Sequence, residues 1–312
     1  MADIVITEFM DETIAAELAA THDVLYDRNL VDRPADLARA AAECRALIVR
    51  NRTQVTAALL DGCPALKVVG RLGVGLENID LDACAARSIE VLPARGANAV
   101  SVAEYVIAAT LMLLRGAYGA TGRVIAGEWP RNALMGREVA GCTMGLVGFG
   151  DIARQVATRA AALGMAVLAH DPFVHAEDPV WRATRVRPVP LEALLRQADA
   201  ISLHVPFTAT TRNMIDAAAI ATMKGDAVLI NTARGGIVDE DAVVAALRAG
   251  RMGGAALDVF AAEPVDAASG ARFADVPNLI LTPHIAGVTN ESNRWTSVLT
   301  ANNVRRALGR LG

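Results

Sequence analysis

Residues 143–153, which read TMGLVGFGDIA, decide the fold of this chain. The apolar run TMGLV predicts a buried strand, and the residues from Asp151 onward have the spacing of a helix. Between the two, Gly148 permits a tight turn, Gly150 lets the backbone approach a diphosphate, and Ala153 is small enough for close packing of helix on sheet. Amide groups at a helix N-terminus favour anions. The stretch therefore predicts a dinucleotide-binding turn; the alternative is a glycine turn with a purely structural role.

An acidic residue ends the next predicted strand, AVLAHD, at residues 166–171. Asp171 follows Ala153 by eighteen residues, a spacing at which a carboxylate accepts hydrogen bonds from the ribose hydroxyls of a dinucleotide. A carboxylate in this position also repels the 2′-phosphate of NADP. We therefore expect NAD as the cofactor, although Arg137, Arg154 or Arg159 could in principle accommodate a phosphate.

The composition limits the class of protein. The chain has 312 residues, of which 53% are hydrophobic and 4% aromatic, and its formal net charge is −4. This length suggests about two domains, and the acidic balance argues against a nucleic-acid partner. Four scattered cysteines without a CxxC pair give no metal-site spacing and favour a cytoplasmic protein with reduced thiols. Because no apolar run is long enough to cross a bilayer, we expect no membrane span.

Short apolar runs alternate with alanine-rich helical stretches along most of the chain. This alternation predicts an α/β fold in which helices cover both faces of a parallel sheet. A long, nearly all-apolar helix is expected from Ser101 to about Gly116. The other predicted strands are residues 3–7, 46–50, 66–71 and 89–93 in the first part of the chain, and 199–206, 227–233, 254–260 and 278–284 in the second.

Three side chains suited to hydride-transfer chemistry follow predicted strands: Arg234, Glu263 and His284. An arginine can bind a carbonyl or carboxylate in bidentate fashion, a histidine can pass a proton near neutral pH, and a carboxylate can orient that histidine. Each also has a simpler interpretation: Arg234 could form a surface ion pair, Glu263 could be a turn residue, and His284 could be structural. His204, which also ends a strand, competes with His284 for the catalytic role.

These motifs resemble the D-isomer-specific 2-hydroxyacid dehydrogenase family over essentially the whole chain. The strings that carry the resemblance are GRLGVGLENID (70–80), SVAEY (101–105), GLVGFGDIA (145–153), HDP (170–172), SLHVP (202–206), NTARGGIVDE (231–240), LDVFAAEP (257–264) and TPHIAG (282–287).

The resemblance implies two Rossmann-like lobes. A flavodoxin-like substrate domain would comprise residues 1–96 and 285–312, and a doubly wound NAD-binding domain, residues 97–284, would be inserted into it. It also implies a homodimer formed largely through the NAD-binding domain and the long helix near residues 101–115.

The resemblance also assigns roles. His284 would protonate the substrate oxygen in reduction, Glu263 would keep that histidine protonated, and Arg234 would bind the 2-oxo and carboxylate oxygens. The backbone amides of Val74 and Gly75 would hold the substrate carboxylate. The implied cofactor contacts are Gly148, Gly150, Asp151, Ile152, Asp171, Val205, Pro206, Thr232, Ala233, Arg234, Asp258, Ala286 and Gly287.

Arg50, Arg71 and Arg131 suggest a substrate with a second anionic group, since a plain 2-hydroxy acid would not need extra cations. The simpler reading is ordinary surface charge. Strings such as ITEFMDE, LIVRNRT and PHIAGVT are similar to the family branch that acts on (S)-sulfolactate, so sulfolactate is the expected substrate. Oxidation of 3-phosphoglycerate and reduction of glyoxylate or hydroxypyruvate are the enzymatic alternatives. A corepressor-like, NAD-sensing binding protein of the same fold is the alternative outside catalysis.

Overall fold

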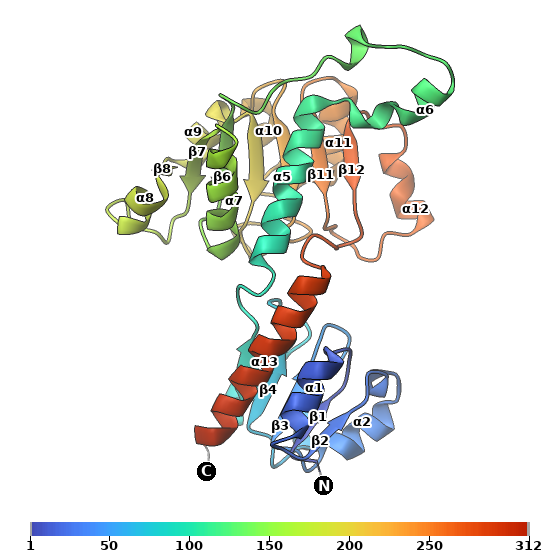
Figure 1. Cartoon of the computed structure of the whole chain (residues 1–312), viewed down its shortest axis with the longest axis vertical. Coiled ribbons are helices and arrows are strands. Elements are labelled where there is room, and N and C mark those ends of the chain that lie inside the picture. Colours follow the sequence, from blue (N-terminus) through green and yellow to red (C-terminus); the bar gives the residue numbers. More distant parts are fainter. Residues whose placement is uncertain (1, 311–312) are drawn as a thin grey trace. The chain divides into compact units, whose positions relative to one another are not determined.

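The computed structural model describes residues 2–310 of the chain (Figure 1). These residues form two compact units: unit 1 contains the chain up to Asn98 and again from Val288 onward, and unit 2 is Ala99–Gly287. Each unit is built on one parallel sheet covered by helices. The prediction of an α/β fold with two Rossmann-like parts is confirmed.

Unit 1 has a five-stranded sheet in the order β2-β1-β3-β4-β5, which is the flavodoxin-like order. Its elements are β1 (Ile4–Ile6), α1 (Glu12–Ala19), β2 (Val24–Tyr26), η1 (Leu30–Asp32), α2 (Pro34–Ala41), β3 (Ala46–Val49), α3 (Ala57–Asp61), β4 (Val68–Arg71), α4 (Leu81–Ala86), β5 (Glu90–Pro93) and α13 (Asn290–Arg310).

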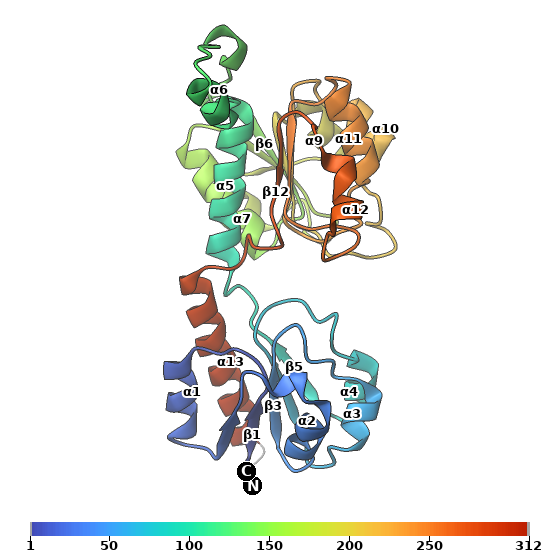
Figure 2. The same ribbon diagram turned by 90° about the vertical axis from the view of Figure 1, so that its right-hand side faces the viewer.

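The two faces of this sheet are covered by different helices. Ile4 and Ile6 pack with residues of α1 and α13, whereas Val5 packs with residues of α2, α3 and α4, as the alternation of side chains along a strand requires. Figure 2 shows α1 and α13 on one side of the sheet and α2, α3 and α4 on the other. Gly70 on β4 allows α13 to approach closely, because a Cβ there would lie 2.7 Å from the Val304 side chain.

Unit 2 has a seven-stranded sheet in the order β12-β11-β10-β9-β6-β7-β8. Its elements are α5 (Ala99–Arg115), η2 (Tyr118–Ala120), α6 (Thr121–Ile125), η3 (Asn132–Leu134), β6 (Thr143–Val147), α7 (Asp151–Ala162), β7 (Ala166–His170), α8 (Pro179–Thr184), β8 (Arg187–Pro188), α9 (Leu191–Gln197), β9 (Ala200–Leu203), α10 (Ala217–Thr222), β10 (Val228–Asn231), α11 (Glu240–Arg248), β11 (Gly254–Leu257), α12 (Ala267–Gly270), η4 (Ala271–Phe273) and β12 (Leu279–Leu281).

The strand order of unit 2 fixes where a ligand can bind. Helices α5 and α7 cover one face of the sheet, and α9, α10 and α11 cover the other. The chain leaves β6 towards β7 on one side, while β9 lies on the other side of β6. The crevice outside the carboxyl ends of β6 and β9 is therefore the topological switch point, where open α/β sheets bind their ligands.

Two short strands are absent from the sequence prediction, β2 and β8. Both lie at a sheet edge, where a strand pairs on one side only. The residues of β2 are half-buried or exposed and polar residues flank them, and β8 has only the two exposed residues Arg187 and Pro188. Neither segment has the apolar run that indicates a buried central strand, so hydrophobic pattern alone does not find them.

No single helix among residues 2–310 is long and apolar enough to cross a membrane. Helix α5 together with the following residues Tyr118–Ile125 meets the length and composition test only as a pair, bent by 67°. Eight residues of α5 are buried inside unit 2, which accounts for its apolar composition.

Candidate functional site

The dinucleotide turn predicted from sequence lies at the carboxyl end of β6. Gly148 adopts φ +91°, and a Cβ there would lie 2.5 Å from the carbonyl oxygen of His204, so this glycine is required by the fold itself. Gly150 differs, because its φ is −79° and a Cβ would meet no atom within 4 Å. The fold does not need a glycine at position 150, so its small size leaves room for a ligand.

Helix α7 begins directly after this turn. Gly150 is its N-cap residue, and no side chain accepts a hydrogen bond from the first amides of the helix. Such amides and the positive end of the helix dipole together bind phosphate groups. Asp151 and Ile152, both predicted cofactor contacts, occupy the first turn of this helix.

Asp171 follows β7, the strand next to β6, and its carboxylate is fixed by two backbone amides. Phe149 N donates to Oδ2 at 2.8 Å, and Phe173 N donates to Oδ1 at 2.9 Å. A carboxylate oxygen has lone pairs for more than one hydrogen bond, so both oxygens can still accept from ribose hydroxyls. The contact with Phe149 N ties Asp171, the predicted ribose-binding residue, directly to the dinucleotide turn.

Further predicted cofactor residues follow the carboxyl ends of β9 and β10, next to the carboxyl end of β6. Leu203 on β9 pairs with Val147 on β6 and with Asn231 on β10, so the three strands end side by side. The residues that follow these strand ends are Val205, Pro206, Thr232 and Ala233.

Three polar atoms at this edge are buried and have no hydrogen-bond partner among the described residues: Ser202 Oγ, His204 Nε2 and Thr232 Oγ1. Burying such a group without a partner costs about 1–3 kcal/mol, which a polar ligand can offset. Burial also lowers the pKa of His204 to about 3, so its ring is neutral near pH 7. The glycine at 150, the exposed helix amides and these three atoms fit a bound NAD.

Arg234 follows β10 on a loop that is held from both sides. The side chain of Asn231, which is 1% exposed, accepts from Ala233 N at 3.1 Å and donates to Arg234 O at 3.0 Å. A Cβ on Gly235 would lie 1.7 Å from the carbonyl oxygen of Phe260, so the loop packs directly on the backbone that leads to Glu263. The guanidinium of Arg234 donates to Ala233 O at 2.7 Å.

Glu263 and His284 are in direct contact. His284 Nδ1 lies 2.8 Å from Glu263 Oε2, and the other carboxylate oxygen accepts from Phe260 N at 2.9 Å. With the carboxylate at Nδ1, that nitrogen carries a proton and Nε2 is left for a reacting molecule. The His284 side chain is 53% exposed, so Nε2 has access to solvent and to ligands.

The loop that carries His284 is held by Asp258, at the end of β11. Its carboxylate, in a residue only 1% exposed, accepts from Ile285 N at 2.8 Å, Ala286 N at 2.9 Å and Thr282 Oγ1 at 2.6 Å. His284 itself has φ +53°, a conformation that a non-glycine residue keeps only when its surroundings impose it. Asp258 is predicted from sequence as a cofactor contact; the geometry shows that its carboxylate fixes the backbone next to His284.

Two further residues of this network are not found by sequence reasoning. Tyr105 on α5 lies with its hydroxyl 2.6 Å from Thr282 Oγ1, so a chain of hydrogen bonds runs from α5 through Thr282 to Asp258. Asn231 likewise enters the sequence analysis only as part of the string NTARGGIVDE. A polar side chain inside an otherwise apolar strand end is the one signal that could have marked Asn231.

In unit 1, the predicted substrate residues lie at the carboxyl ends of β3 and β4, which are neighbours in the sheet. Arg50 follows β3, and Arg71 ends β4 with its guanidinium donating to Leu72 O at 2.7 Å. The loop then turns at Gly73, where φ is +143°. Among residues 2–310, the amides of Val74 and Gly75 donate to no backbone carbonyl, so they are available to an anion.

Arg131 is not brought near His284 within its own chain. The segment after α5 is tied to the amino ends of the strands, because Arg137 donates to Asp199 and Asp226, which precede β9 and β10. Arg131 lines a surface pocket of about 840 Å³ together with Arg115, Trp129 and neighbouring residues.

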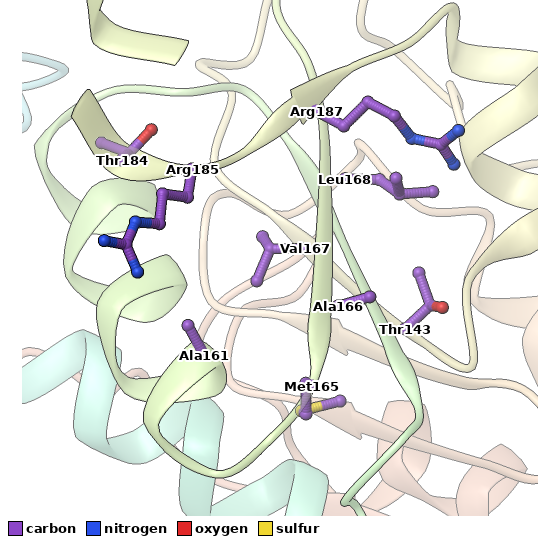
Figure 3. Close-up of a pocket in the computed structure, with 9 residues that line it drawn as sticks. All are labelled: Thr143, Ala161, Met165, Ala166, Val167, Leu168, Thr184, Arg185 and Arg187. Carbon is purple, nitrogen blue, oxygen red and sulfur yellow. The ribbon is translucent and has the colours of Figure 1, made fainter. Parts of the chain in front are cut away.

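A second pocket, of about 330 Å³, also lies away from the predicted site (Figure 3). Its lining includes Thr143 and Ala166, the first residues of β6 and β7, and the side chains of Arg185 and Arg187. None of the predicted site residues lines it. The described residues also contain no group of three or more His, Cys, Asp or Glu side chains that could hold a metal ion.

The chain is similar to known 2-hydroxyacid dehydrogenases over most of its length. The family model described as "D-isomer specific 2-hydroxyacid dehydrogenase, NAD binding domain" matches residues 107–286. The (S)-sulfolactate dehydrogenase of Chromohalobacter salexigens is 58% identical over 309 residues, 99% of each chain. The hydroxypyruvate reductase of Thermotoga maritima is 38% identical over 88% of each chain. Among solved structures, D-lactate dehydrogenase from Aquifex aeolicus, in complex with NAD and lactic acid, superposes with a TM-score of 0.83 at 29% identity, covering 98% of this chain and 96% of that one.

Proposed function

Because the chain belongs to the D-isomer specific 2-hydroxyacid dehydrogenase family and is therefore an NAD-dependent oxidoreductase, we propose that its substrate is (S)-sulfolactate. The observation that carries the chemistry is the 2.8 Å contact between His284 and Glu263, at the sheet edge that also carries the dinucleotide turn. The 58% identity to a sulfolactate dehydrogenase supports the choice of substrate.

In oxidation, His284 Nε2 takes the proton of the substrate hydroxyl as the C2–O bond becomes a carbonyl. The dinucleotide-binding turn, the first amides of α7 and Asp171 would hold NAD, which would supply the hydride acceptor for C2. Glu263 stabilises the imidazolium that forms, through its contact with Nδ1. Arg234 binds the 2-oxygen and the adjacent carboxylate, which orients C2 and stabilises the charge on the oxygen. In reduction the same proton returns from Nε2 to the carbonyl oxygen.

Besides Arg234, the contacts proposed for the anionic groups of the substrate come from unit 1. The amides of Val74 and Gly75 bind the carboxylate, and Arg71 lies beside them on the same loop. Arg50 binds the sulfonate, since a guanidinium can donate two N–H groups to two oxygens of one anionic group.

The proposal includes a cytoplasmic homodimer. Unit 2 exposes a set of large apolar side chains on α5 and the segment after it, which a second copy would cover: Val100, Met112, Tyr118, Val124, Ile125, Trp129 and Met135. Arg131 belongs to this segment, so its proposed contact with substrate would be made across the dimer. Four buried free cysteines suit a reducing compartment.

Initial rates with NAD test the proposal on a panel of sulfolactate, 3-phosphoglycerate, lactate, glycerate and glycolate, with hydroxypyruvate and glyoxylate in the reverse direction. We expect sulfolactate to have the highest kcat/KM. A higher value for hydroxypyruvate would favour the second candidate, since a hydroxypyruvate reductase matches 88% of the chain. No change in nicotinamide absorbance with any member would indicate an NAD-sensing binding protein instead.

His284→Gln tests the assigned chemistry. Loss of the acid–base group should lower kcat by about 100- to 10,000-fold with little change in the Kd for NAD. Normal turnover by this variant would remove His284 from the mechanism and bring back His204 as the candidate.

A further inference from the structure

A buried carboxylate at the end of β1 organises the loop that carries Arg50. Glu8 is 4% exposed, and its Oε1 accepts from Arg50 N and Thr53 N, both at 2.9 Å. Its Oε2 accepts from Arg52 N at 3.0 Å. Three backbone amides of one short loop therefore converge on a single carboxylate.

Convergent amides of this kind form an anion-binding nest. Burial by itself would raise the pKa of Glu8, but the amide donors of Thr53, Arg50 and Arg52 outweigh burial and the pKa is lowered. The carboxylate is thus ionised and fills the nest. A substrate anion cannot use these amides and must be bound by side chains of the loop.

The opposite side of the loop is fixed as well. Asn78, which is 8% exposed, donates from Nδ2 to Thr53 O at 2.7 Å and to Arg50 O at 3.2 Å. Thr7, next to Glu8, places its hydroxyl 2.8 Å from that of Thr53. The backbone at Arg50 is held by side chains from two separate segments.

The side chain of Arg50 is held in turn. Its Nη2 donates to Asn293 Oδ1, on α13, at 2.6 Å. Its guanidinium carbon lies 5.7 Å from the ring centroid of Phe9, the residue after Glu8, and that of Arg28 lies 5.9 Å from the same centroid. Of the five N–H donors of a guanidinium, the contact with Asn293 uses one, so others are left for a ligand.

We propose that Glu8 and Asn293 are positioning residues, which fix Arg50 in the orientation that binds the second anionic group of the substrate. The inference rests on the proposed function of Arg50. Neither residue touches the substrate: Glu8 acts through the loop backbone, and Asn293 acts through one guanidinium nitrogen. Their effect is therefore on selectivity for the anionic tail rather than on hydride transfer.

The readout is the ratio of kcat/KM for sulfolactate to kcat/KM for lactate, which lacks the tail. Glu8→Gln places an amide donor against Arg52 N–H, and Asn293→Ala removes the contact with Nη2. Either change, like Arg50→Ala, should lower the ratio by about tenfold or more, the cost of one charge-assisted hydrogen bond. In the Arg50→Ala background, Glu8→Gln should change the ratio by less than about twofold, as expected when both residues act on one contact.

Asn303→Ala, on the same helix, is the matched control and should leave the ratio unchanged. If Glu8→Gln folds poorly, Asn293→Ala still tests the inference, since alanine suits a helix. An unchanged ratio in Asn293→Ala, or an equal loss on both substrates, would overturn it. A ratio that falls in Arg50→Ala alone overturns the positioning roles but leaves the proposed function intact; a ratio unaffected by Arg50→Ala removes the proposed tail contact itself.

Discussion

Replacement of Asp258 by asparagine tests the geometry that holds His284. The carboxylate accepts three hydrogen bonds, from Thr282 Oγ1, Ile285 N and Ala286 N, at 2.6–2.9 Å. An asparagine side chain of the same shape keeps one acceptor oxygen and puts an amide donor where the other oxygen stood. At least one of the two backbone amides then faces a donor.

The size of the effect follows from these contacts. A hydrogen bond to a charged group contributes about 1.5–3 kcal/mol, so losing one should lower the free energy of unfolding of unit 2 by about 2 kcal/mol. The left-handed conformation of His284, which itself costs about 1–3 kcal/mol, is then less well enforced. A displacement of about 1 Å at a catalytic group can lower the rate about 100-fold.

The assay separates this positioning role from the proposed contact with NAD. Single-turnover hydride transfer at saturating NAD should slow by about 100-fold in Asp258→Asn. The Asp216→Asn variant, at the N-cap of α10, is the control, because asparagine caps a helix as well as aspartate does. A normal single-turnover rate combined with a raised Kd for NAD would show that Asp258 contacts the cofactor and does not position His284.

Three further predictions concern the dinucleotide turn, the catalytic pair and His204. Gly150→Ala should leave thermal stability unchanged but weaken NAD binding by about tenfold or more. Gly148→Ala should lower the Tm, because Gly148 has φ +91° and a Cβ there would clash with His204 O. Equal losses of Tm in the two variants would contradict the assignment of Gly150 to the ligand. Glu263→Gln keeps the size of the side chain but not its charge, so kcat should fall by about 10- to 100-fold, and an unchanged kcat would show that the imidazolium needs no partner. The pKa of His204 is about 3 in the folded chain and about 6.5 when unfolded, so protons bind preferentially to the unfolded chain as pH falls below about 6.5. Stability should drop from that pH towards pH 3, and less steeply in His204→Gln; urea titrations at a series of pH values measure both slopes.

The sequence predicts what depends on local pattern. Apolar runs locate the central strands, and Gly148, Gly150 and Asp171 mark the dinucleotide turn because their spacing along the chain is itself the signal. The edge strands β2 and β8 lack that signal, since they bury little apolar surface.

What the sequence does not reveal are contacts between distant segments. Asn293 lies 243 positions from Arg50 along the chain, and Glu8 lies 42 positions from the same residue, so no local pattern links them. Arg131 shows the converse case. Its charge suggests a substrate contact in the sequence, whereas Arg137 ties the segment after α5 to the residues that precede β9 and β10.

The most direct test of the proposed substrate is the kcat/KM of the purified chain with NAD for sulfolactate, compared with that for glycerate under identical conditions. We expect a preference for sulfolactate of about 100-fold or more, because about two charge-assisted hydrogen bonds would form with the anionic tail. An equal or higher kcat/KM for glycerate would contradict it and would reduce Arg50 and Arg71 to ordinary charged residues.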